Sequence, residues 1–292
     1  KSGFGVSVTL TVGATGGTGG RGGGTASASL DETSTITTQG SESRGMMLQS
    51  IGGGGGASQG GSLGFNIPAS GFADAVPSYS FKLRLGQTGG TAGSGGASSG
   101  RNDGEITTFG GGADGVLVQS IGGGGGVGGS AASMGSETVS SLQLNLGGSG
   151  GAGGNGGAAS LTFEEGGAIT TAGYGAMGAL VQSVGGGGGQ GGSGSDRIVA
   201  APGTDDVGSI QLGVRGADGV DNQDSGAVAV TGPATISTAG MDASALVLQS
   251  IAGGGGVALA GNANVAELSG FDGAPGASGY IQTTVATGNG SA

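Results

Sequence analysis

The sequence predicts an all-β protein: a parallel β-solenoid (β-helix) of about four repeats of about 67 residues, with glycine-rich, polyproline-II-like segments between its strands. Three observations lead to this prediction. Three motifs recur in a fixed order, apolar residues alternate with polar ones at a period of two, and no stretch of 10 residues carries the periodicity and caps of an α-helix. One glycine-rich repeat is not expected to fold alone, so stacked repeats with a shared core are the expected architecture.

The most regular motif is an apolar strand that ends in Gln-Ser and runs into a series of glycines. Its glutamines lie 70, 63 and 67 residues apart, and a second motif, Ile-Thr-Thr or Ile-Ser-Thr, begins 13 residues before each of them. Because this interval never changes, we expect it to form one rigid unit in which successive glutamines stack in line. The isoleucines are Ile36, Ile106, Ile169 and Ile236, and the glutamines are Gln49, Gln119, Gln182 and Gln249.

A third motif, of alternating character, opens each repeat. Its copies begin at Val8, Phe81, Leu142, Ile210 and Ile281. They divide a single repeat array into approximate units at residues 6–80, 81–141, 142–209 and 210–280, with the start of a fifth unit at residues 281–292. Since the first and last copies are equivalent and no capping segment stands outside them, we expect the chain to be a piece of a longer array.

Several kinds of strand are expected within one repeat. The opening motif Phe81–Leu85 alternates apolar and polar residues, which is typical of a strand with one buried face. In the glutamine motif Val116–Ile121 both faces are mainly apolar, so we expect this strand to be covered on both sides. The β-branched Ile-Thr-Thr motif fits a third strand, and a weaker strand is expected before it, as at Leu161–Phe163 or Val228–Val230.

The chain contains 81 glycines, and many of them follow a three-residue phase. Residues Gly147–Gly157 read GGSGGAGGNGG, with Ser149, Ala152 and Asn155 at every third place. This phase matches the three residues per turn of a polyproline-II helix and favours ordered segments packed side by side, joined by weak Cα–H···O contacts. A flexible linker or a disordered segment is the alternative that the composition also permits.

Composition argues against several functions. The chain has no histidine and no cysteine, which removes the commonest general base, disulfides and thiolate metal sites. With 8 basic and 19 acidic residues it has no basic patch for nucleic acid, and no apolar run is long enough to span a membrane. A polysaccharide-processing enzyme on a solenoid would need aromatic platforms, yet aromatic residues are only 3%. We therefore expect no enzyme activity and no cofactor.

The segment Ile169–Ser195, together with Gly147–Gly157 before it, resembles the glycine-rich repeats of very large Gram-negative autotransporter adhesins. The resemblance covers nearly the whole chain, but the fourth unit replaces the first glycine of the pentaglycine with Ala252 and largely loses the triplet phase. It implies a secreted passenger region at the cell surface, with a role in adhesion, biofilm or surface structure. The implied partners are adjacent repeats or copies of the chain, joined end to end, and host or surface glycans.

Three groups of residues are candidate binding sites. The glutamines could bind a ligand, although mutual hydrogen bonding in an amide ladder explains them as well. Paired hydroxyl residues in the second motif could form an ice-binding rank, although strand chemistry already favours threonine there; they are Thr37, Thr38, Thr107, Thr108, Thr170, Thr171, Ser237 and Thr238. Weak metal candidates are Asp218, Asp221 and Asp224, which loosely resemble a calcium loop, and the alternative is a solvated acidic loop. The alternative function is thus a solenoid that binds glycan, calcium or ice.

Overall fold

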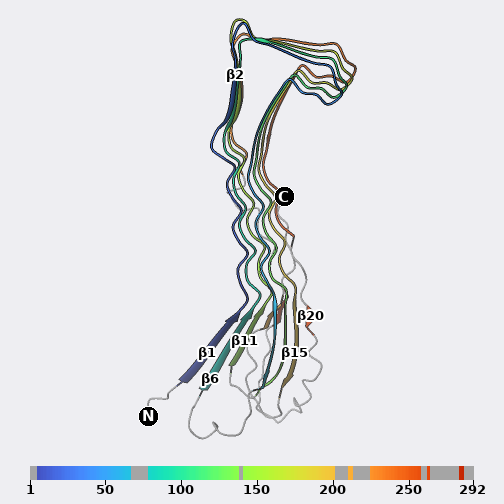
Figure 1. Ribbon diagram of the computed structural model, residues 1–292. Helices are drawn as coiled ribbons and strands as arrows, with labels where there is room; N and C mark the ends of the chain where they lie inside the picture. The colour runs from blue at the N-terminus through green and yellow to red at the C-terminus, as the bar shows by residue number, and fades with distance from the viewer. Residues whose placement is uncertain are drawn as a thin grey trace.

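The computed structural model describes residues 5–66, 78–137, 141–200, 210–212, 224–257, 262–263 and 283–285. These residues form β-strands and no helix, so the described part of the protein is all-β, as the sequence predicts. Accordingly, no helix in these segments is long and apolar enough to cross a membrane. All strands belong to five sheets, and every pairing is parallel (Figure 1).

Two sheets form the base of the molecule, at the lower end of Figure 1. The first base sheet contains β1 (Gly5–Val12), β6 (Ser78–Leu85), β11 (Ser141–Leu146), β16 (Ile210–Leu212) and β21 (Thr283–Val285). The second base sheet contains β5 (Gly61–Asn66), β10 (Ala131–Glu137), β15 (Gly194–Ala200) and β20 (Asn262–Ala263).

Three further sheets form a head at the opposite end. The first head sheet contains β2 (Ala26–Leu30), β7 (Ser98–Asn102), β12 (Ala159–Phe163) and β17 (Val228–Thr231). The second contains β3 (Thr35–Thr38), β8 (Glu105–Thr108), β13 (Ala168–Thr171) and β18 (Thr235–Thr238). The third contains β4 (Met46–Ile51), β9 (Val116–Ile121), β14 (Ala179–Val184) and β19 (Leu246–Ile251).

Neighbouring strands in each sheet are five strands apart in chain order. The chain therefore visits all five sheets before it returns beside its starting point, and we name the successive passes layer 1 (β1–β5), layer 2 (β6–β10), layer 3 (β11–β15) and layer 4 (β16–β20). In the head, equivalent motif residues pair directly: Ile106 pairs with Ile36 and Ile169. The constant spacing in the sequence thus corresponds to a constant path from the second head sheet to the third.

The register of the first base sheet corrects the sequence alignment in layer 4. Ile210 pairs with Leu144, two residues later than the opening motif predicts, and Thr283 pairs with Ile210. The alignment is governed by the strand ends, since Leu146 and Leu212 pair and each precedes a glycine in the sequence. A shift of two residues preserves which side chains share a face. The predicted start of the last copy, Ile281, lies outside the described residues.

The hydrophobic core lies in the head, between the three head sheets. Ile106, Val116, Val118, Leu161 and Ile169 are fully buried there. They come from the inward faces of all three sheets in layers 2 and 3. Because each layer covers the next, several equivalents in the end layers are only partly buried, although Met46 and Leu48 of layer 1 remain buried. The partly buried residues are Ala28, Leu30, Ile36, Val228, Val230 and Ile236.

The outward face of the glutamine strand is covered to a different extent in different layers: in β9, for which cover on both faces was expected, the outward Leu117 is only 5% exposed, whereas the outward face of the edge strand β4 is open. In β4 the side chains alternate, with Met46 and Leu48 buried, while Met47 is 54% and Ile51 is 53% exposed. Only the inward face meets the first head sheet, and no described sheet lies over the outward face. The outward apolar residues instead form rows along the stack.

A glycine-rich stalk joins the base to the head, visible in Figure 1 as undulating traces side by side. Among the described residues, layers 1 to 3 contribute an outbound run toward the head (residues 14–24, 87–97 and 148–158), and all four layers contribute a return run toward the base (52–59, 122–130, 185–193 and 252–257). Backbone N–H groups of the runs donate to carbonyls of neighbouring runs with a period of three residues, and in layer 2 two of every three residues donate, as Gly89 and Gly90 do. The runs are therefore ordered, and N–H···O bonds join them, where only weak Cα–H···O contacts were predicted.

Candidate functional site

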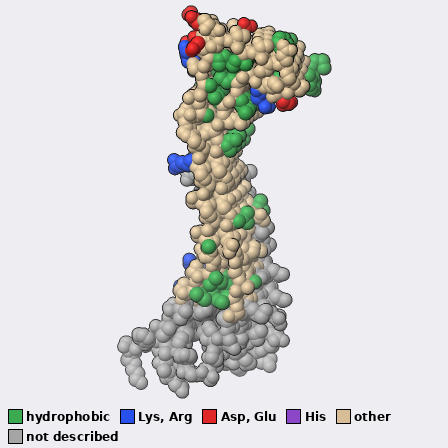
Figure 2. Space-filling view, viewed as in Figure 1, with side chains coloured by type: hydrophobic (Ala, Val, Ile, Leu, Met, Phe, Trp, Pro, Cys, Tyr) green, Lys and Arg blue, Asp and Glu red, His purple; other side chains and the backbone are tan. Residues whose placement is uncertain are grey.

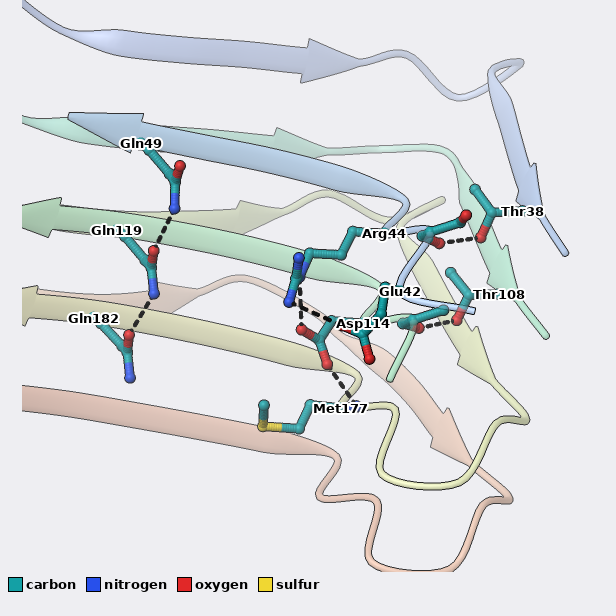
Figure 3. A network of polar contacts seen from close by, with 11 residues as sticks. Thr38, Glu42, Arg44, Gln49, Thr108, Asp114, Gln119, Met177 and Gln182 are labelled. Carbon is teal, nitrogen blue, oxygen red and sulfur yellow. Dashed lines mark hydrogen bonds and ion pairs between the residues drawn. The ribbon is translucent and has the colours of Figure 1, made fainter. Parts of the chain in front are cut away.

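The four glutamines form a ladder on the outward face of the third head sheet. Gln49 Nε2 donates to Gln119 Oε1 and Gln119 Nε2 donates to Gln182 Oε1, both at 2.6 Å (Figure 3). Gln182 donates in turn to Gln249. Each inner amide thus uses one of its two N–H donors and its carbonyl oxygen in bonds to neighbouring layers, and the ladder holds strand register.

The serine after each glutamine points to the opposite face and joins the head to the stalk. Ser120 Oγ donates to Gly96 O and accepts from Gly157 N–H, both at 2.7 Å. Ser183 does the same between Gly157 O at 2.8 Å and Gly226 N–H at 2.6 Å. One hydroxyl therefore links the outbound runs of two successive layers.

Sequence reasoning did not assign a role to these serines. The signal was present, since Ser follows Gln in all four copies: Ser50, Ser120, Ser183 and Ser250. What the sequence does not reveal is the partner, because the bonded glycines lie 24 to 46 residues away along the chain.

The threonines of the second motif divide into two ranks. Thr108 and Thr171 are fully buried, and their hydroxyls donate to Ala113 O at 2.5 Å and Ala176 O at 2.8 Å, closing the corner between the second and third head sheets. The same bond recurs in the end layers from Thr38 and Thr238. Only the other rank points outward, so a surface rank of paired hydroxyls is not formed; it consists of Thr37, Thr107, Thr170 and Ser237.

The corner itself needs a left-handed residue. Four equivalent positions have φ between 58° and 65°, occupied by Glu42, Gly112, Gly175 and Asp242. Glycine adopts this conformation without strain, whereas an acidic residue there is unusual. The two acidic residues lie in layers 1 and 4, and the glycines in the two inner layers, where a β-carbon on Gly112 would come within 2.1 Å of the Glu42 carboxylate.

A buried aspartate locks the corner across three layers. The side chain of Asp114 is only 5% exposed. Its Oδ2 accepts from Arg44 Nε and its Oδ1 from Met177 N–H, each at 3.0 Å (Figure 3). Both carboxylate oxygens are therefore used within the fold, and the group is structural.

A second ion pair lies on the first head sheet and is exposed. Arg101 Nε donates to Glu164 Oε1 at 3.0 Å, and Asp103 lies 3.5 Å from the same guanidinium. The bond to Glu164 is the main cause that raises the pKa of Arg101 above its ordinary value. Because the guanidinium and the Glu164 carboxylate are both more than 40% exposed, the pair adds little to stability.

The stalk excludes side chains at two of every three positions. A β-carbon on Gly154 would lie 1.9 Å from Gly93 O in the preceding layer, and one on Gly150 would lie 2.5 Å from the Gly189 carbonyl carbon in the return run. The third position of each triplet, such as Ser149, is partly exposed. Glycine is thus required by close backbone approach and not by flexibility.

The acidic candidates do not form a metal site in the described residues. Asp218 and Asp221 lie outside them, and Asp224 is exposed. Asp224 is the layer 4 equivalent of Asn155. Its backbone carbonyl accepts from Gly156 N–H at 2.9 Å. The described residues contain no group of three or more acidic side chains able to hold an ion.

The surface has few charges along the stalk, where backbone and uncharged side chains dominate the face seen in Figure 2.

No protein-family model, no curated protein and no solved structure matches the chain. The resemblance to autotransporter adhesins therefore stays a prediction that rests on the repeat motifs.

Proposed function

We propose that the chain is a non-catalytic structural segment of a secreted bacterial surface protein, built as a parallel β-solenoid of four repeats at the unit boundaries predicted above. The single observation that carries the proposal is that polar side chains of the head bond between layers. The glutamine ladder, the serine bridges and Asp114 all bond from one layer to the next. Bonds of this kind hold the layers together, which is what a structural scaffold requires.

Regular stacking also explains the composition. Each glycine placed in a regular element costs about 0.5–1 kcal/mol relative to alanine, so a glycine-rich layer is unstable alone. Stacking returns several backbone hydrogen bonds per layer, for example Gly89 N–H to Ser149 O at 2.8 Å and Gly125 N–H to Gly187 O at 2.8 Å. We infer that repetition stabilises each layer, and that the stack serves as an adhesin passenger or a surface filament, without an enzyme site or a cofactor.

The location is tested by immunogold labelling of intact source cells with antibodies raised against the purified chain. We expect gold on the surface of unpermeabilised cells, on rods anchored to the cell or on extracellular filaments. Labelling that appears only after permeabilisation would contradict the proposal.

A ligand-binding solenoid is the second candidate. The observation in its favour is the outward hydroxyl rank, in which Thr107 pairs with Thr37 and Thr170. Glycan arrays and ice-recrystallisation assays test it, and a serine-to-valine and threonine-to-valine series along the rank should abolish any binding. The absence of binding in both assays would leave the structural role alone.

A further inference from the structure

The face of the stack formed by layer 1 is open. Layer 1 supplies the edge strand of every sheet. A β-carbon on Gly17, Gly20 or Gly23 of its outbound run would meet nothing within 4 Å. The equivalent layer 2 glycines would place a β-carbon 1.8, 1.9 and 2.3 Å from a layer 1 carbonyl oxygen; they are Gly90, Gly93 and Gly96. Layer 1 thus keeps glycines that its described surroundings do not require.

Within the part of the chain that the structure describes, the same face also presents backbone N–H groups without an acceptor. In layer 2, Gly90 N–H donates to Gly56 O and Gly93 N–H donates to Gly53 O, both at 2.8 Å, across the boundary to layer 1. The equivalent N–H groups in layer 1 belong to Gly17 and Gly20, and no described layer precedes them. An additional glycine-rich layer would supply the missing acceptors.

The layer 4 face carries the matching groups. Gly253 and Gly256 are the equivalents of Gly53 and Gly56, whose carbonyls accept from the next layer. The inward residues Leu246 and Leu248 are 41% and 45% exposed there, although their layer 2 equivalents are fully buried. The two end faces are therefore complementary halves of the contact that already joins one layer to the next.

We propose that a second copy of this chain stacks head to tail on the first, with its layer 1 face on the layer 4 face of its partner. This proposal rests on the structural role argued above and names the partner of that role. The contact continues the stalk and the head sheets, and its edge strands carry no charge or proline that would oppose pairing: β2, β3, β4, β17, β18 and β19. Such a heterologous contact does not close and yields linear assemblies.

Two features weaken the contact. A β-carbon on Gly52 or Gly122 would lie 1.9 Å from a carbonyl of the next layer, and Ala252 places a methyl group at this position in layer 4. In the first base sheet, the three residue pairs of β21 occupy the edge of β16, for which β1 of the incoming copy competes. Ala252 is therefore a residue that limits assembly.

The test is sedimentation velocity of the purified chain over a wide concentration range, with three variants. Gly20→Val blocks the layer 1 face, and Gly124→Val is the matched control, because its β-carbon also meets nothing within 4 Å but lies on the side of the stalk. Ala252→Gly removes the obstructing methyl group. Dilute thermal unfolding of all three should match the wild type, which separates assembly from folding.

We expect concentration-dependent association of the wild type, at least about tenfold weaker association for Gly20→Val, no change for Gly124→Val and stronger association for Ala252→Gly. A wild type that stays monomeric throughout overturns the proposal. So does equal association of Gly20→Val and wild type, a loss confined to Gly124→Val, or an Ala252→Gly variant that associates no better. None of these results bears on surface location, so the proposed function is tested separately.

Discussion

Ser120 Oγ lies 2.7 Å from the amide nitrogen of Gly157, one layer further along the stack. The same hydroxyl donates to Gly96 in its own layer, so one buried atom connects two backbones. It stands where the apolar core of the head gives way to the stalk, and it replaces the backbone donor and acceptor that a continued glycine run would supply.

Replacing this serine should destabilise the fold. Ser120→Ala leaves a buried N–H and a buried carbonyl without their partner, so we expect a loss of about 2 kcal/mol in the free energy of unfolding. Ser250→Ala is the control, because Ser250 is exposed, its bond to Gly226 O is 3.4 Å long, and its 2.7 Å contact with Ser225 Oγ is also exposed. Urea titration measures both, and equal effects would show that the bridge contributes nothing specific.

Valine at Gly150 should be far more harmful than alanine at the neighbouring Ser149. The β-carbon of the first would press on the return run at 2.5 Å, whereas the serine side chain is partly exposed. We expect a loss of about 3 kcal/mol for Gly150→Val and under about 0.5 kcal/mol for Ser149→Ala. Similar melting temperatures for the two variants would instead favour a flexible stalk.

Asp114, which is buried at the corner, is expected to contribute more to the free energy of unfolding than the exposed carboxylate of Glu42. Asp114→Ala removes the acceptor of Met177 N–H and the partner of Arg44, and we expect a loss of about 2 kcal/mol. Glu42→Gln touches only a 3.7 Å pair with a carboxylate that is 72% exposed, so its effect should be within about 0.5 kcal/mol. Urea denaturation midpoints measure both effects, and the midpoint of Asp114→Ala should be the lower of the two. A midpoint for Glu42→Gln as low as that of Asp114→Ala would contradict the prediction.

Metal removal should leave the fold unchanged. Excess chelator is expected to give the same melting curve as untreated protein, since the described residues hold no cluster of acidic ligands. A large drop in melting temperature that calcium restores would mean that the acidic loop around Asp224 is a metal site after all.

The head could be predicted from the sequence more fully than the stalk. Period-two alternation and the constant interval from Ile106 to Gln119 predicted parallel, stacked strands, and the weak strand expected at Leu161–Phe163 lies within β12. Local sequence could not predict that the outward face of β4 is open, because its apolar residues resemble those of a covered strand. The exposure of that face depends on which other parts of the fold pack against the strand.

The second base sheet was missed for a different reason. Its strands, Gly61–Asn66, Ala131–Glu137 and Gly194–Ala200, share no motif and no clean alternation. They pair because the preceding return runs bring them into line, so their structure depends on the stack and not on their own sequence. The hydrogen bonds of the stalk are likewise between layers, and a repeat considered alone does not contain them.

The central claim is that the glycine runs form an ordered, hydrogen-bonded stack, and amide hydrogen exchange followed by mass spectrometry or NMR tests it most directly. Gly89, Gly125 and Gly154 donate bonds of 2.8 Å to neighbouring runs and should exchange as slowly as the amides of strand β9. Exchange of these glycines at the rate of an unstructured chain, while β9 remains protected, would contradict the account.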